Sequence, residues 1–326
     1  MTQITAEQRY TISVLRKEGK SKKEIAKTIG KHPSSIGREL KRNCDLRSGE
    51  YRSELAEKKC RERHKFKLKA IKLTEEIKWH IYSKLKLRYS PEQIYGRAKL
   101  EGIKMVSHET IYQYIWKDKA NHGDIYNNLR RNGKRYRKRG ASKDHRGQIV
   151  DRVDISARPP IVEQKERIGD LEVDTIIGAQ HQGALVTIVD RKTKATKIGL
   201  LASKDSELLA DKIRIMLASW TFVKTMTSDN GKEFAQHKTI AKDCRLDFYF
   251  AEPYKSWQRG LNENTNGLIR QFIGKKTHFT YLTDRYIQFI EDNLNNRPRK
   301  TLNYYTPNEV LLQELNSQNG KIAFIT

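Results

Sequence analysis

The stretch from Ile168 to Ala202, IGDLEVDTIIGAQHQGALVTIVDRKTKATKIGLLA, decides the fold. Its first part, 168–178, alternates apolar and polar residues and is rich in β-branched side chains, a pattern typical of a strand. The segments 183–194 and 195–202 continue this pattern and predict a hairpin that turns at residues 190–194. We therefore expect three consecutive antiparallel strands.

Beyond this hairpin, helical and extended patterns alternate along the chain. The expected order is a helix, a strand, a helix, a strand and a late helix, at 203–220, 222–229, 231–244, 246–251 and 258–274. Three antiparallel strands followed by strands that alternate with helices describe an α/β sheet of the ribonuclease H type. The predicted fold class is therefore multi-domain, with a helical first half followed by an α/β ribonuclease H-like catalytic domain.

Three carboxylates stand where such a sheet gathers its ligands. Asp174 lies in the first strand, Asp229 at the carboxyl end of the fourth, and Glu263 near the start of the late helix, 34 positions after Asp229. Ligands of open α/β sheets gather at the carboxyl ends of the strands. Carboxylate oxygens suit Mg²⁺ or Mn²⁺ rather than zinc. Two such ions about 4 Å apart can hold the attacking and leaving oxygens of a phosphodiester in line.

Any one of these acids, taken alone, could instead be solvated or ion-paired. Their surroundings favour a site. Asp229 is followed by Asn230 and Gly231, a turn that exposes the acid at the end of its strand. Glu263 lies in QRGLNEN (258–264), which is more polar than the start of a packed helix requires.

Other acids near Asp174 compete for the role of first ligand. Asp170 and Glu172 share its face of the strand, because side chains alternate along a strand. Both precede the apolar run 175–177, so Asp174 is expected at the buried middle of the strand, where an unpaired carboxylate needs a metal ion. Asp190 is expected in the hairpin turn, paired with its cationic neighbours. Glu172 could support the metal ligands from one pleat away.

The positive charge of the chain is concentrated in its first half. The 326 residues carry 65 Lys and Arg against 39 Asp and Glu, a formal net charge of +26. Residues 1–150 account for +22 of this excess, and residues 151–326 for only +4. This asymmetry predicts a polyanion such as nucleic acid as the partner of the first half, and the helix-turn-helix patterns described next favour double-stranded DNA. A basic surface that is merely solvated is the alternative.

Residues 5–42 are expected to form three helices with the spacing of a DNA-binding helix-turn-helix. The small Ala26 lets two helices approach, Gly30 permits the turn, and Ile36 holds the third helix in place. Thr5 and Ser21 are the expected N-caps. The apolar positions of the first helix are Tyr10, Val14 and Leu15. The side chains expected to reach base edges and phosphates are Ser34, Ser35, Arg38, Lys41 and Arg42.

A second unit of this kind is expected at 73–117, with an ordinary helical hairpin as the alternative. Thr74, Ser90 and Ser107 are the expected N-caps of its helices. The side chains expected to be exposed for DNA contact are His108, Thr110, Gln113 and Lys117. A basic, glycine-punctuated linker follows, and it is expected to track phosphates through Arg135, Arg137, Lys138 and Arg139.

These patterns divide the chain into five expected segments. They are a helix-turn-helix domain, a basic connecting helix, a second helix-turn-helix-like domain, a basic linker and the catalytic domain with its C-terminal helices, at 1–50, 51–72, 73–132, 133–160 and 161–326. No apolar run approaches the roughly 18 residues that span a bilayer. The first ten residues do not resemble a secretory signal, and the three cysteines are too far apart for a zinc cluster or a disulfide framework. A soluble, cytoplasmic protein is therefore expected.

Several motifs together resemble the insertion-sequence transposases of the IS-thirty family. They are TSDNGKEF, PYKSWQRGLNENTNGLIRQF, NLNNRPRKTLNYYTPNEVL and SKKEIAKTIGKHPSSIGRELKRN, at 227–234, 253–272, 293–311 and 21–43. GDLEVDTIIG and GALVTIVDRKTK are also similar to the first strands of that family. The resemblance covers nearly the whole chain. One departure is Leu171, where the family usually has a bulky aromatic residue.

This resemblance implies an integrase-like core with a D-D-E triad, which falls on Asp174, Asp229 and Glu263. It implies a transposase that cuts and rejoins DNA at the terminal inverted repeats of its own element, with two Mg²⁺ or Mn²⁺ ions per active site. Because two DNA ends must be paired, a homodimer or a higher homo-oligomer on DNA is expected. Three cations flank the third acid, and they are expected either to hold phosphates or to form a solvated face: Lys255, Arg259 and Lys275.

Two other functions remain open at this point. One is a non-catalytic, sequence-specific DNA-binding repressor that uses the sheet as a dimerisation scaffold, although such a protein has no need of three acids. The other is a structure-specific nuclease of the same fold, which would not need two helix-turn-helix units. Tyr254 and Trp257 could stack on an unpaired base or could pack on the sheet.

Overall fold

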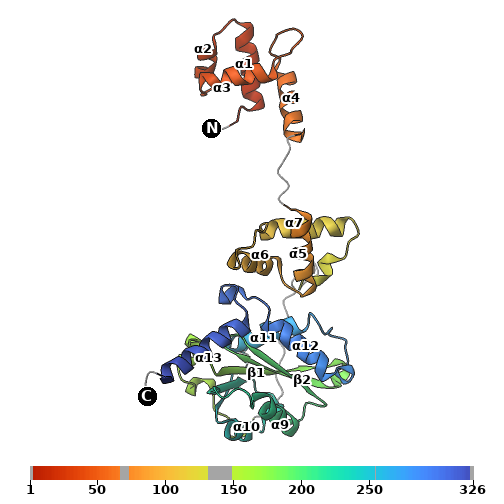
Figure 1. Cartoon of the computed structure of the whole chain (residues 1–326), viewed down its shortest axis with the longest axis vertical. Coiled ribbons are helices and arrows are strands. Elements are labelled where there is room, and N and C mark those ends of the chain that lie inside the picture. The colour runs from red at the N-terminus through yellow and green to blue at the C-terminus, as the bar shows by residue number, and fades with distance from the viewer. Residues whose placement is uncertain (1–2, 67–72, 131–148, 254, 324–326) are drawn as a thin grey trace. The chain divides into compact units, whose positions relative to one another are not determined.

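A computed structural model describes residues 3–66, 73–130, 149–253 and 255–323 of the chain (Figure 1). These residues belong to two units, Met1–Lys72 and Leu73–Thr326, and each unit is described here by itself. Within the described ranges, no helix has both the length and the apolar character needed to cross a membrane.

Four helices form the described part of the first unit: α1 (Ala6–Lys17), α2 (Lys22–Thr28), α3 (Pro33–Asn43) and α4 (Ser53–Phe66). The predicted N-caps are confirmed, because Thr5 and Ser21 form full capping boxes at the starts of α1 and α2. Gly30, at φ 64°, makes the turn between α2 and α3. Positive φ is a conformation that glycine adopts without steric cost.

The core of this unit joins apolar residues of all four helices to one buried arginine. Ile12, Ala26 and Ile36 are almost fully buried. The expected apolar face of α1 is partly wrong, because Tyr10 is 66% exposed whereas Arg9 is only 4% exposed. The reason is an ion-pair cluster: Arg9 donates to Glu39 of α3 at 2.8 Å and to Glu57 of α4 at 2.6 Å.

The second unit begins with α5 (Glu75–Lys86), α6 (Pro91–Leu100), α7 (His108–Ala120) and the 3-10 turn η1 (Ile125–Asn128). Thr74, Ser90 and Ser107 cap the three helices, as predicted. Their buried faces form one cluster with Ile81, Leu85, Ile94, Ile111 and Ile115 at its centre. This part of the chain is therefore a helical layer with its own core.

A five-stranded sheet follows, with strand order β3-β2-β1-β4-β5. Its strands are β1 (Asp170–Ile177), β2 (Ala184–Asp190), β3 (Thr196–Leu201), β4 (Thr225–Ser228) and β5 (Asp247–Phe250). β1, β2 and β3 are antiparallel neighbours, whereas β4 runs parallel to both β1 and β5. The predicted hairpin and the predicted ribonuclease H-like topology are confirmed.

Helices cover both faces of this sheet (Figure 1). On one face, α9 (Ser206–Leu217) and α10 (His237–Cys244) pack on a cluster that includes Leu171, Val173 and Phe248. On the other face, α11 (Gly260–Ile269) and α12 (Asp284–Asn295) pack on Ile176 and Leu185. The remaining elements are η2 (Ile155–Ala157), α8 (Ile161–Gln164), η3 (Ala179–His181), η4 (Lys232–Phe234), η5 (Ser256–Arg259), η6 (Phe279–Tyr281), η7 (Lys300–Leu302) and α13 (Pro307–Ala323).

The helical layer of the second unit is attached to the sheet domain through α6. Arg97 donates two hydrogen bonds of 2.7 Å to the carboxylate of Glu309 in α13. These bonds lower the pKa of Glu309 to about 2, so the carboxylate stays ionised at neutral pH. Gln93 donates to the carbonyl of Pro298 at 2.7 Å. A Cβ atom at Gly96 would lie 2.3 Å from the ring of Tyr304, so only glycine fits this contact.

We expect Gly96→Ala to destabilise the second unit by about 1–3 kcal/mol, because the added methyl group overlaps the Tyr304 ring. The matched control is Gly37→Ala in α3, where a Cβ atom meets nothing within 4 Å. That change should stabilise the first unit by up to about 1 kcal/mol, since alanine favours a helix more than glycine does. Amide hydrogen exchange of the full chain measures both effects, and equal shifts in the two variants would contradict the close contact at Gly96.

Candidate active site and DNA-binding surfaces

The parallel pairing of β1 and β4 places Asp174 and Asp229 side by side. The register sets Glu172 opposite Thr227. Two residues further along each chain lie Asp174 and Asp229, which therefore occupy the same face at the carboxyl end of β4. Both side chains are partly accessible, at 22% and 29%. Two of the three predicted catalytic acids are thus neighbours.

Arg259 bridges these two carboxylates from the start of α11. Its guanidinium nitrogens lie 3.6 Å from Asp174 Oδ1 and 3.4 Å from Asp229 Oδ2. Asn266, two turns further along α11, donates to Asp174 Oδ2 at 2.8 Å. The Gly231 amide donates to Asp229 Oδ1 at 2.9 Å. The Thr175 amide also donates to Asp174 Oδ1, at 2.9 Å, so neutral donors orient both acids and the two acids share one cation.

The electrostatics of the pair follow from its burial. Burial raises the pKa of Asp174, the Arg259 guanidinium opposes that rise, and the Asp229 carboxylate adds to it. Two nearby carboxylates repel each other when both are ionised, so the site requires positive charge. In the described residues Arg259 supplies that charge, and its Nε atom is buried without a hydrogen-bond partner.

Glu263, the third predicted acid, lies in the first turn of α11 and is exposed. It makes no hydrogen bond or ion pair within the described ranges, nor do three acidic, histidine or cysteine side chains there come close enough to share a metal ion. Its place on the helix is nevertheless informative. Arg259 is four residues before it and Asn266 three residues after it, so all three share one helix face. The triad itself stays a prediction.

The expectation that Asp174 is the buried acid of its strand is wrong. The side chains of Asp170 and Glu172 are 0% and 3% exposed, against 22% for Asp174. Asp170 accepts two hydrogen bonds from Arg167, at 2.8 and 3.0 Å, and a third from Thr225. Buried acids on this face therefore have protein partners, and partial exposure, rather than burial, distinguishes Asp174.

The expectation for Asp190 also needs correction. Asp190 lies at the hairpin turn, as predicted, but it is fully buried and pairs with no cation there. Oδ1 accepts hydrogen bonds from the Thr193 amide at 2.7 Å, the Thr193 hydroxyl at 2.8 Å and the Lys192 amide at 3.1 Å. Oδ2 accepts one from the Gly169 amide at 2.8 Å. Its role in the described structure is to hold the turn against the start of β1.

Sequence reasoning missed Asn266, which contacts Asp174, and Glu233, which is 5% exposed. Glu233 accepts a hydrogen bond from Thr175 at 2.8 Å and pairs with Lys204 at 2.7 Å. Asn266 could have been found, because it is one turn from Glu263 on the same polar helix face. No comparable signal marks Glu233.

The predicted DNA-contacting residues of α3 mostly face outward. Ser34, Arg38, Lys41 and Arg42 are exposed and Ser35 is half-buried. Arg38 donates through Nε to the carbonyl of Ser34 at 3.2 Å, which aligns its side chain along the helix. The surface of α3 therefore carries three exposed cations in two helical turns.

The predictions for α7 and for the residues around Glu263 are met only in part. Gln113 and Lys117 are exposed, but His108 and Thr110 are half-buried, because Thr110 contacts the Ser107 cap and His108 lies against Tyr95. Lys255 is ion-paired with Glu252 at 2.5 Å, and Arg259 bridges the two acids. Trp257 is 71% exposed, so it does not pack on the sheet. Tyr254, Arg135, Arg137, Lys138 and Arg139 lie outside the described residues.

Comparisons with known proteins identify the family of the chain. Residues 1–43 match the family described as a helix-turn-helix domain. The chain is 51% identical over 326 residues to the transposase for insertion sequence element IS4351 of Bacteroides fragilis, covering 98% of each chain. It is 33% identical over 302 residues to the transposase InsI for insertion sequence element IS30A of Escherichia coli strain K12, covering 88% of this chain and 77% of that protein.

Among solved structures, the catalytic core domain of BIV integrase matches with a TM-score of 0.38 and 16% identity, over 46% of this chain and 98% of that one. The sequence relatives are the decisive finding. The chain belongs to the family of insertion-sequence transposases. Within that family, it is similar to the transposases of IS4351 and IS30A. The helix-turn-helix match indicates that DNA is its partner.

Asp190→Asn should lower the free energy of unfolding of the second unit by about 1–3 kcal/mol, because an amide cannot accept all four hydrogen bonds and one donor is left unsatisfied. Denaturant unfolding of the full chain measures the change. Asp247→Asn, the same substitution at an exposed acid of β5, is the control and should be nearly neutral. Equal effects at both positions would contradict the structural role of Asp190.

Arg38→Ala should weaken binding to DNA from the ends of the element by about 1–3 kcal/mol, and should weaken binding to unrelated DNA much less, if Arg38 reads a base. Arg16→Ala removes an exposed arginine from α1 of the same unit and is the matched control. Binding titrations of the full chain at several salt concentrations measure both. A loss that is uniform across sequences would assign Arg38 to a phosphate contact instead.

Proposed function

We propose that this chain binds the terminal inverted repeats of its own insertion sequence and catalyses DNA cleavage and strand transfer, using Mg²⁺ held by Asp174, Asp229 and Glu263. The substrates are the two element ends and a target DNA. The products are a transposed element joined to new flanking DNA. The family membership supports the coarse activity, and the residues at the carboxyl end of β4 support the finer assignment.

The observation that carries this proposal is the pair of carboxylates bridged by Arg259. The guanidinium nitrogens of Arg259 lie 3.6 Å from Asp174 and 3.4 Å from Asp229. The two acids therefore form a site that attracts positive charge. The neighbouring Asp170 has its own arginine and threonine partners, so Asp174 and Asp229 are the acids here that share a single cation. The polar face of α11, with Asn266 on Asp174, brings Glu263 onto the same side of the helix.

The donor set fits a hard divalent cation. Asp174 and Asp229 offer carboxylate oxygens, the ligands that Mg²⁺ prefers, and no histidine or cysteine contacts them in the described part of the chain. Burial raises the pKa of Asp174, and a divalent ion would offset that rise and keep the acid ionised. When bound, the ions supply Lewis-acid activation at the attacking and leaving oxygens of a phosphodiester.

The residues of the chain divide the remaining work. Asn266 and the Gly231 amide each hold one oxygen of an acid, and the other two oxygens, Asp174 Oδ1 and Asp229 Oδ2, face the shared cation. Arg259 lies between the two acids. If a divalent ion took that place, the guanidinium would be free to bind a phosphate oxygen of the DNA, because arginine offers a planar fork of donors. The outward residues of α3 and α7 contribute recognition of the ends, and a homodimer on DNA would present two active sites to two ends.

We expect Asp174→Asn, Asp229→Asn and Glu263→Gln each to abolish cleavage and strand transfer while binding to the element ends survives. Each change removes a ligand charge at nearly constant shape, so the loss should be at least about a thousandfold in rate. The measurement is cleavage of a labelled element end by the full chain in Mg²⁺ and in Mn²⁺, with a chelator as the metal-free reference.

Asp170→Asn and Glu233→Gln are the matched controls, because both residues are buried acids on or beside β1 with protein partners. They should keep substantial metal-dependent cleavage at temperatures where they remain folded. Robust cleavage by Asp229→Asn, or cleavage by the unaltered chain in excess chelator, would overturn the assignment of the triad.

A further inference from the structure

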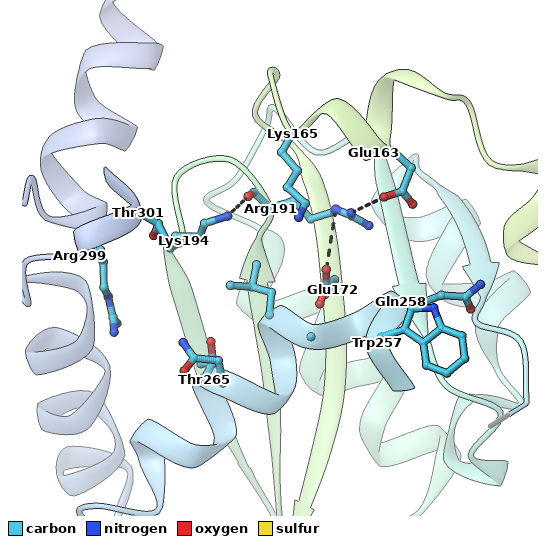
Figure 2. A pocket seen from close by; sticks show the side chains of 13 residues that line it. Glu163, Lys165, Glu172, Arg191, Lys194, Trp257, Gln258, Thr265, Arg299 and Thr301 are labelled. Atoms are coloured by element: carbon cyan, nitrogen blue, oxygen red, sulfur yellow. Dashed lines mark hydrogen bonds and ion pairs between the residues drawn. The ribbon is translucent and has the colours of Figure 1, made fainter. Parts of the chain in front are cut away.

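A cavity of about 520 Å³ lies beside the first turn of α11, on the face of β1 that also carries Asp174 (Figure 2). The loop before β1, the β2–β3 turn, the start of α11 and the turn η7 enclose it. Its charged lining consists of Lys165, Arg191, Lys194 and Arg299 against the two acids Glu163 and Glu172. The cations outnumber the acids by two, so the lining carries an excess of positive charge.

Arg191 is the centre of this cluster and is only 2% exposed. Its Nη2 donates to Glu163 at 3.0 Å, and its Nε lies 3.7 Å from Glu172, too long for a hydrogen bond (Figure 2). Nη1 is buried and finds no hydrogen-bond partner in the described part of the chain. A buried guanidinium with an unused donor is costly unless a ligand completes it.

The other cations surround the same space. The Lys194 ammonium donates to the carbonyl of Arg191. Burial, together with the nearby charge of Lys165, lowers the pKa of Lys194 to about 8. Arg299 has a buried Nε atom without a hydrogen-bond partner among the described residues. Glu163 and Glu172 offset only part of this positive charge, and a bound anion would reduce the repulsion that remains between the cations.

We propose that this cavity binds a backbone phosphate of the DNA strand that enters the active site. The inference rests on the proposed function and adds a substrate subsite to it. Glu172 is two residues before Asp174 on one face of β1, so the cavity is about 7 Å from the catalytic acids. That is the distance of one or two nucleotides along a strand. Arginine presents donors in the planar fork that phosphate oxygens accept, and the exposed face of Trp257 at the rim offers a surface for the adjoining sugar or base.

The test neutralises single phosphates in the DNA and single cations in the protein. Element-end duplexes carry one methylphosphonate at each position near the cleavage site, and the full chain binds them in chelator. The unaltered chain should lose about tenfold in affinity at one phosphate of the cleaved strand. Lys165→Gln and Lys194→Gln should each lose several-fold on unmodified DNA and should become insensitive to methylphosphonate at that same position.

Lys192→Gln is the matched control, because Lys192 lies in the same turn but pairs with Glu314 at 2.6 Å and does not line the cavity. It should keep the full sensitivity of the unaltered chain. The proposal would be overturned if the Lys165, Lys194 and Lys192 variants were equally sensitive to methylphosphonate at every phosphate. It would also be overturned if millimolar inorganic phosphate, at constant ionic strength, lowered the DNA affinity of the cavity variants but not that of the unaltered chain. Failure of the unaltered chain to bind or cleave the element ends at all would instead refute the proposed function.

Discussion

The position of β1 between an antiparallel and a parallel neighbour is the constraint on which the site depends. Pairing with β2 places the hairpin turn against the start of β1. Pairing with β4 sets the register that brings Asp174 beside Asp229. Like charges held this close need a cation between them. Arg259, just before the first residue of α11, supplies that cation, and Asn266 of α11 donates to Asp174.

One face of β1 carries three acids in succession, and each is matched to an arginine from a different part of the chain. Asp170 pairs with Arg167, which immediately precedes the strand. Glu172 lies near Arg191 of the hairpin turn, and also accepts from the amide of Asn262 at 3.2 Å. Asp174 shares Arg259 with Asp229. The arginine contact is tightest at Asp170, with two short hydrogen bonds, and longer at Glu172 and Asp174, at 3.7 and 3.6 Å. Asp174 differs from the other two in its exposure, 22% against 0% and 3%, so it is the acid of this face that is accessible to a ligand.

Local signals in the sequence were sufficient for the main helices and strands and for the expectation that Asp174 and Asp229 lie close together. Caps such as Thr5, Ser21 and Ser90 depend on residues within four positions, and strand alternation depends on immediate neighbours, so both could be predicted. The burial of Asp170 could not, because it depends on Thr225, 55 positions away. The partners of Asp190 were missed for a similar reason, since Gly169 reaches it across the sheet. The exposure of residues in α7 depends on how Tyr95 and the Ser107 cap pack, which the helical period does not specify.

The attachment of α6 to α13 has a consequence for how the enzyme handles DNA. Glycine at position 96 lets the Tyr304 ring close against the helix, and the Arg97–Glu309 pair fastens the same contact with two hydrogen bonds. Because α7 packs on α6 in one core, the same contact links α7 to the catalytic strands. If α7 binds the element end, this link would limit the length of duplex between the bound sequence and the cut bond. The cleavage position would then depend on that length rather than on recognition of the bases at the cut.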